Sequence, residues 1–146
     1  MFISEILKDL ICKMPMQVVA AYAYHDKYVS IDLKDVHGQD VSMRVYLCDW
    51  TLRERARTLA SSNIEIGRCK PAIATLVGTQ LIDFVQHDTE RLELFFECGK
   101  SLQLMANLEA YDDDDDLIMI YVPNQYGAAY SPEAGFRKEF VERMLQ

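Results

Sequence analysis

Two His-Asp dipeptides are the first residues in this sequence that could do acid-base or metal chemistry. They are His25-Asp26 and His87-Asp88. A histidine beside an acid can act as a general base, and two such pairs could together bind a metal ion. Neighbouring side chains on a strand point to opposite faces, however, and both pairs fall where we predict turns. We therefore expect these histidines, and His37 in a further turn, to face water.

Four cysteines are the next candidates for chemistry. Cys12, Cys48, Cys69 and Cys98 form no Cys-x-x-Cys pair, so neither a zinc knuckle nor a thioredoxin-type site is indicated. A nucleophilic Cys48 or Cys98 would need a base elsewhere in the fold, and neither lies in a known nucleophile motif. The sequence also lacks a glycine-rich phosphate loop, a Gly-x-Ser-x-Gly elbow and a His-Glu-x-x-His helix. We predict core or inert thiols, no cofactor, no metal site and no enzymatic activity.

A run of five aspartates is the strongest charge feature of the chain. Adjacent like charges repel one another, so they avoid burial and usually form a solvated loop. The run lacks the glycine and the spacing of an EF-hand calcium loop. Tyrosines lie on both sides of it, and tyrosines with carboxylates suit an interface for a basic protein, so a binding edge and a solubilising loop both stay open. The predicted partner-binding residues are Tyr111, Asp112, Asp113, Asp114, Asp115, Asp116, Tyr121 and Tyr126.

The distribution of charge indicates which partners the chain attracts. The formal net charge is −8. Residues 1–70 hold ten basic and nine acidic side chains, whereas residues 71–146 hold five basic and fourteen acidic ones. An acidic half attracts basic partners and repels phosphate backbones. Nucleic-acid binding is therefore disfavoured, although a basic stripe at Arg53, Arg55 and Arg57 leaves that class open.

The length and the apolar content suit one domain. With 146 residues, of which 50% are hydrophobic, the chain can bury a single core, and we expect one domain over residues 1–146. No segment reaches the ~18 consecutive apolar residues of a membrane span. Glu5, Lys8 and Asp9 interrupt the N-terminal segment, so a signal peptide is not indicated. We expect a cytoplasmic protein that does not enter a membrane, and the oligomeric state is left open.

Hydrophobic periodicity predicts an α+β fold, mainly antiparallel β with a helix at each end. Apolar residues at helical spacing, with Ser4 as a cap and Pro15 as the stop, predict a short N-terminal helix. Residues 50–61 suit either a helix or a pair of strands. Alternating apolar residues predict strands in residues 17–26, 27–36, 41–47, 74–87, 91–99, 100–107, 117–123 and 127–131.

A helix is also predicted to close the chain. Ser131 suits its cap, Pro132 its first turn, and Glu133 the positive end of its dipole. Its buried stripe would consist of Phe136, Phe140, Val141 and Met144.

An internal repeat predicts two similar halves within the domain, about residues 18–46 and 81–104. Each half contains a His-Asp pair, an alternating strand, a glycine and a second alternating strand. Convergent hairpin patterning could produce the same pattern, so a duplication and a coincidence both stay open. We interpret the chain as two β-meanders that share one core. The matched residues are His25 with His87, Val29 with Leu92, and Gly38 with Gly99.

The order of these segments resembles a known class of protein. LCDWTLRERARTLASSN is similar to a strand and a return strand ending in Ser-Asn, and PAIATLVGTQLIDFV to the element that opens a second half. LELFFECGKSLQLMAN follows as a strand pair, with YDDDDDLIMIYV and GAAYSPEAGF as closing segments. Over roughly residues 16–140 the chain resembles small bacterial immunity proteins of polymorphic toxin systems, including contact-dependent growth inhibition. The resemblance favours strands for residues 50–61.

The resemblance implies an antidote that binds a cognate toxin domain in the cytosol and occludes its active site. Such toxins are often nucleases, whose basic clefts would complement an acidic surface. Many relatives carry a tryptophan after a tyrosine-acid pair, whereas this chain continues with Asp114 to Asp116, and no family binding residue carries over. The alternative is a small-molecule- or metal-binding β domain that uses His25, His87 and nearby acids.

Overall fold

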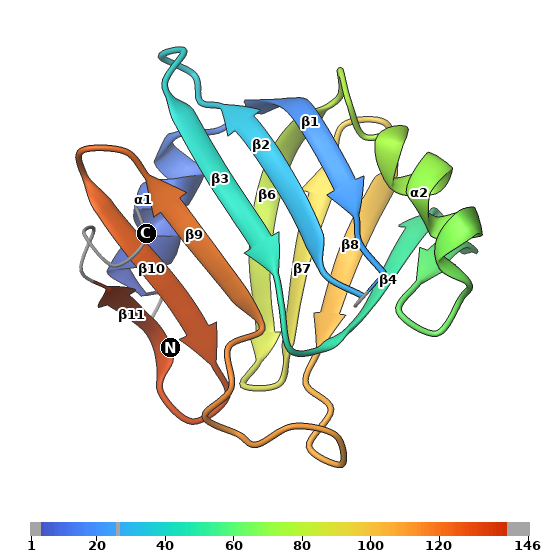
Figure 1. The fold of residues 1–146 in the computed structure, drawn as a ribbon. Helices are drawn as coiled ribbons and strands as arrows, with labels where there is room; N and C mark the ends of the chain where they lie inside the picture. The colour runs from blue at the N-terminus through green and yellow to red at the C-terminus, as the bar shows by residue number, and fades with distance from the viewer. Residues whose placement is uncertain (1–3, 26, 140–146) are drawn as a thin grey trace.

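The computed structural model describes residues 4–25 and 27–139, which form one antiparallel sheet of 11 strands and two short helices (Figure 1). The helices are α1 (Glu5–Cys12) and α2 (Ile66–Ala74). The strands are β1 (Met16–Ala23), β2 (Val29–Lys34), β3 (Asp40–Val45), β4 (Asp49–Glu54), β5 (Arg57–Ser61), β6 (Gln80–Asp88), β7 (Arg91–Phe96), β8 (Lys100–Met105), β9 (Ile118–Val122), β10 (Tyr126–Ser131) and β11 (Gly135–Glu139).

The order of the strands divides the sheet into two arms that meet at its centre. That order is β11-β10-β9-β3-β2-β1-β6-β7-β8-β4-β5. The first arm consists of the meander β1–β2–β3 extended by β9, β10 and β11, and the second of the meander β6–β7–β8 extended by β4 and β5. A short pairing joins them, in which Met16 opposes Leu81 and Gln17 opposes Gln80. Each arm therefore combines a local meander with strands from elsewhere in the chain.

The sheet bends at this central joint, so the two arms enclose a shared core. Figure 1 shows β1, β2 and β3 in front of β6, β7 and β8. The Phe84 ring of β6 packs edge-on against Phe136 of β11, with ring centroids 5.9 Å apart. On the other side, the indole Nε1 of Trp50 in β4 donates to the carbonyl of Lys27, 2.7 Å away, in the β1–β2 turn. Contacts between the arms at both sides close the core.

The alternation of apolar residues decides which face of each strand is buried. In β2, Val29, Ile31 and Leu33 are at most 1% exposed, whereas Asp32 and Lys34 lie on the outer face. The two helices cover the flanks: α1 contacts β6 and β11, and α2 contacts β1 and β5. Burial of alternate side chains from both arms supplies most of the stability expected for such a domain. No helix in the described part of the chain is long and apolar enough to cross a membrane.

The sequence-based expectations are confirmed for most of the sheet. The N-terminal helix is confirmed, with the Ser4 hydroxyl accepting from the Leu7 amide at 3.0 Å as the predicted cap. Residues 50–61 are strands, β4 and β5, joined at Arg55 with φ +55°. The other predicted strands are also present, although the segment 74–87 becomes a strand only at Gln80. The fold is therefore mostly antiparallel β, as predicted.

The predicted C-terminal helix is wrong where the structure describes it. Ser131 ends β10, and Gly135–Glu139 form β11, antiparallel to β10. The Ser131 hydroxyl does accept from a backbone amide three residues on, that of Ala134, but it closes a hairpin turn. Gly135 has φ +69°, which an α-helix does not use, and it turns the chain back along β10. Phe136 contributes to the core from β11, whereas Phe140, Val141 and Met144 lie outside the described residues.

Helix α2 was not predicted from the sequence. It contains Gly67 and Pro71, residues that disfavour a helix interior, and Glu65 at its start makes no side-chain capping bond. Cys69 and Ile73 point inward and are at most 1% exposed. Tertiary burial against β1 and β5 therefore stabilises this helix more than its local propensity does.

The hairpins at the heart of the two arms have the same register. Ile31 opposes Met43 and Leu33 opposes Val41 in the β2–β3 hairpin. Leu92 opposes Leu104 and Leu94 opposes Leu102 in β7–β8, so both hairpins span the same number of residues. Their turns hold glycine at equivalent places, Gly38 with φ +79° and Gly99 with φ +80°. By this register, the residue of the first hairpin equivalent to Leu92 is Ile31, whereas the sequence repeat matched Val29 with Leu92. The duplication itself stays a prediction.

Candidate functional site

The aspartate run lies in a loop, residues 106–117, that connects β8 to β9 and is named here the acidic loop. Its backbone is held at several points. The Leu47 amide donates to the carbonyl of Asp116 at 3.0 Å, and the Glu133 amide donates to the carbonyl of Asp113 at 2.8 Å. The Arg137 guanidinium donates to both carboxylate oxygens of Asp116, at 2.7 and 3.0 Å. The acidic loop is therefore anchored to the β3–β4 connection and to the β10–β11 hairpin.

The five carboxylates of the acidic loop differ in their surroundings. Asp116 neutralises Arg137, and the Asp115 carboxylate accepts from the Asp112 amide at 2.9 Å, which closes a turn. The side chains of Asp112, Asp113 and Asp114 are exposed. Three of the five predicted aspartates are thus directed to solvent, and the other two shape the loop that presents them.

The predicted tyrosines are not brought together. Tyr111 is half-buried in the acidic loop, and Tyr121 is half-buried on the outer face of β9, further along the sheet. Tyr126 is 8% exposed on the inner face of β10, where its hydroxyl donates to Asp9 of α1. Burial, followed by the Asp9 carboxylate, raises the pKa of Tyr126 above its ordinary range. Tyr126 therefore joins α1 to the sheet and does not belong to an exposed surface.

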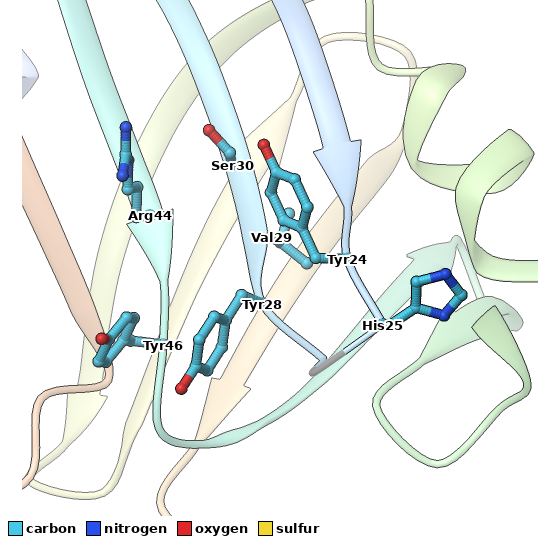
Figure 2. A pocket seen from close by; sticks show the side chains of 7 residues that line it. All are labelled: Tyr24, His25, Tyr28, Val29, Ser30, Arg44 and Tyr46. Atoms are coloured by element: carbon cyan, nitrogen blue, oxygen red, sulfur yellow. The ribbon is translucent and has the colours of Figure 1, made fainter.

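A groove on the outer face of the first arm lies beside the acidic loop. Its cavity has a volume of about 510 Å³ and lies over the ends of β1, β2 and β3. Figure 2 shows the side chains around it, with Tyr28 and Tyr46 facing each other at one end. Their rings stack with centroids 4.5 Å apart and planes 17° from parallel. We name it the tyrosine groove, and its lining residues are Tyr24, His25, Tyr28, Val29, Ser30, Arg44 and Tyr46.

The strand registers place Arg44 at the centre of an outer-face row. Tyr22 of β1 opposes Ser30 of β2, Ser30 opposes Arg44 of β3, and Arg44 opposes Met119 of β9. We name these four residues the first row. Arg44 is exposed, and its guanidinium makes no ion pair within residues 4–25 and 27–139. Its cross-strand neighbours are Ser30 and Met119, and the next outer-face residue of β2 is Asp32, whose carboxylate accepts from the Ser42 hydroxyl at 3.1 Å. The guanidinium is therefore available to a negative group from outside.

The end of the acidic loop lies beside the tyrosine groove. The backbone amide of Tyr46, which lines the groove, donates to the carbonyl of Leu117 at 2.9 Å. The next residue, Leu47, bonds to Asp116 in the same way. The end of the acidic loop therefore extends directly from the end of β3.

The two histidines lie on different arms, and Asp26 lies outside the described residues. His25 follows β1 and His87 lies near the end of β6, two strands that pair only at Met16 with Leu81 and Gln17 with Gln80. His25 lines the tyrosine groove, whereas the Nε2 of His87 lies 2.8 Å from the Glu93 carboxylate on the second arm. No cluster of three or more His, Cys, Asp or Glu side chains suited to a metal occurs among the described residues.

The cysteines differ in exposure. Cys48 is 3% exposed, and burial, with the neighbouring Asp49 charge, raises the pKa of its thiol to about 12. A thiol with so high a pKa is almost fully protonated at neutral pH, which makes it a poor nucleophile. Cys69 is also buried, and its thiol lies 3.3 Å from the carbonyl of Ser61. Cys12 and Cys98 are exposed, so the expectation of packed core thiols fits Cys48 and Cys69.

Sequence reasoning missed Arg44 and the stacked tyrosine pair. The alternation in residues 41–47 places Arg44 and Tyr46 on the face opposite the buried Met43 and Val45, and this much could be found in the sequence. What the sequence does not contain is the register that sets Ser30 opposite Arg44, because that depends on the length and shape of a turn.

The chain was compared with protein-family models, with curated proteins and with solved structures, and none of the three comparisons gives a match.

Proposed function

We propose that this chain is an immunity-type binding protein that neutralises a cognate toxin domain by covering its active site. The observation that carries the proposal is the acidic loop, which presents Asp112, Asp113 and Asp114 to solvent while Asp116 anchors it through Arg137. A loop already held in place loses less conformational entropy on binding than a free one does, so its charges act as a preformed surface. The proposal also draws on the resemblance of the sequence to immunity proteins.

The mechanism would be electrostatic and steric. Exposed carboxylates would accept hydrogen bonds from arginines and lysines that otherwise hold substrate phosphates, as in the cleft of a nuclease. The formal net charge of −8 would speed the encounter with a basic domain. The stacked Tyr28 and Tyr46 adjoin the acidic loop and would supply contact area of the kind common at the centre of interfaces. This chain would act by occupancy, without chemistry of its own.

The proposal is tested first by rescue. The protein domain encoded directly upstream of this chain would be induced in cells with and without it, and the pair would then be co-purified. Specific rescue together with a stable complex would support the immunity function. Survival that does not depend on this chain, with no complex at any salt concentration, would contradict it.

The role of the acidic loop is tested by neutralising its exposed charges. Replacing Asp112, Asp113 and Asp114 with asparagine, and keeping Asp116, should slow association with the toxin domain about tenfold at low salt and flatten its salt dependence. A matched control replaces three exposed glutamates outside the acidic loop with glutamine, namely Glu65, Glu90 and Glu97. Equal slowing in both variants would show that only net charge matters, and unchanged kinetics would remove the acidic loop from the mechanism.

A further inference from the structure

We propose that the tyrosine groove binds an acidic side chain of the protein partner, with Arg44 as its counter-charge. The inference deepens the proposed function, on which it rests in taking the occupant to be a protein. The partner would then present a basic surface to the acidic loop and a carboxylate to the groove beside it. Such a paired requirement would give specificity that attraction between net charges alone does not give.

The surroundings of Arg44 favour a carboxylate from outside. The position opposite it on β2 holds Ser30, which is 8% exposed, and the position opposite it on β9 holds Met119. Neither side chain carries a negative charge, and among the described residues the other titratable groups that line the groove are His25 and three tyrosines. In a protein with a net charge of −8, the described lining of the groove thus holds no acid. A planar guanidinium matches a carboxylate with two parallel hydrogen bonds.

The walls of the groove indicate that the carboxylate belongs to a protein. Tyr24 is 47% exposed and Tyr22, at the end of the first row, is 55% exposed. Aromatic rings with a polar hydroxyl and a central arginine are the residues that most often dominate protein interfaces. The groove lies on the outer face of a sheet, beside the end of the acidic loop. A partner surface can cover the groove together with the neighbouring end of the acidic loop.

The test uses a random peptide library displayed on phage and selected against the folded wild-type chain. We expect the enriched peptides to contain an aspartate or glutamate beside an apolar residue, and to lose binding when that acid is replaced by its amide. Arg44→Met should weaken their binding at least about tenfold. Arg53→Met is the matched control, because Arg53 is an exposed arginine on the outer face of β4 and should have no effect.

A second variant keeps Arg44 and supplies an internal competitor for it. In Ser30→Asp the new carboxylate stands directly opposite Arg44, where cross-strand side chains come within reach of each other, so it should weaken peptide binding as strongly as Arg44→Met. Ser101→Asp is its matched control, because it places the same new charge opposite Arg53 on the second arm, outside the groove, and should keep binding. Thermal unfolding of each variant confirms that it folds, so loss of binding is not mistaken for loss of structure.

The outcomes separate this inference from the proposed function. Peptides without acids, or acidic peptides that bind Arg44→Met equally well, would overturn the groove assignment and leave the rescue experiment unaffected. If no peptide is enriched and free N-acetylglutamate binds at the groove instead, the occupant is a small molecule and the inference of a protein occupant is overturned. If acidic peptides bind in a manner that depends on Arg44, but the chain does not rescue cells from the toxin domain, the groove assignment is supported and the immunity function is rejected.

Discussion

The outer faces of the two arms differ in the side chains that surround their arginine. The first row is Tyr22–Ser30–Arg44–Met119. At the corresponding place on the second arm, Asp88 opposes Arg91, Arg91 opposes Met105, and Met105 opposes Asp49, and we name these the second row. Arg91 lies 2.9 Å from the carboxylate of its neighbour Asp88, whereas Arg44 has a serine and a methionine as neighbours.

The difference indicates which outer face is available to a binding partner. Both rows belong to hairpins with the same register, apolar inner pairs at equivalent positions and a glycine with φ near +80° in the turn. At the end of the second arm that holds the second row, the outer charges pair as Arg91–Asp88 and His87–Glu93. At the equivalent end of the first arm, the outer face holds tyrosines and Arg44, which makes no ion pair with another described residue, whereas Lys34 and Asp40 pair near the β2–β3 turn. Equal scaffolds with unequal outer faces place the candidate interface on the first arm.

The largest expected effect tests whether the inner faces are equivalent. Met43 and Leu104 occupy the same place in the two hairpins, and both are fully buried. Met43→Ala and Leu104→Ala should each lower the free energy of unfolding by about 2–5 kcal/mol, through lost burial and the cavity left behind. Urea unfolding measures both, with Met105→Ala, 42% exposed on the outer face, as a control that changes little. A variant that unfolds in two steps would show that the arms are separate cooperative units.

The next effect tests whether the turns are equivalent. Gly38 and Gly99 both have positive φ, and a Cβ at either place meets nothing closer than ordinary contact with Arg55. Gly38→Ala and Gly99→Ala should therefore each cost about 1 kcal/mol from backbone strain alone. Equal shifts in the urea midpoint are expected. A cost at one turn only would show that the hairpins share a register without sharing turn energetics.

Much of this comparison could be predicted from the sequence. The alternation of apolar residues in β2, β3, β7 and β8 predicts which side chains enter the core, because burial on one face requires a period of two. The Ser4 cap and the Pro15 stop predict α1 because they act locally. The acidic loop was also expected, since five like charges avoid burial.

The remainder depends on contacts that no local pattern contains. Helix α2 forms despite Gly67 and Pro71, because Cys69 and Ile73 are buried where the helix packs against β1 and β5. The Ser131 segment has the composition of a helix start and becomes a hairpin, because β11 finds a partner in β10. Tyr126 was predicted at the interface for its neighbours in sequence, yet the inner face of β10 takes it into the core. Register and tertiary pairing decided each case.

The smallest expected effect concerns the charge pair of the second row and its dependence on pH. Hydrogen bonds from the Glu90 amide, and then from the Arg91 side chain, lower the pKa of Asp88 from its ordinary value. A lowered pKa in the folded state means that Asp88 stabilises the fold above the pKa of an unfolded aspartate, about 4, and that this contribution is lost as the pH falls through the lower folded value. Asp88→Asn should therefore destabilise the fold slightly at pH 7, by less than the core or the glycine substitutions above. In strong acid its stability should equal that of the wild type.

Thermal unfolding across that pH range measures the difference in stability, with Asp83→Asn on the same strand as control. A difference between wild type and Asp88→Asn that is constant with pH would show that the charge of Asp88 contributes nothing, and the contrast between the two rows would then rest on Arg44 alone.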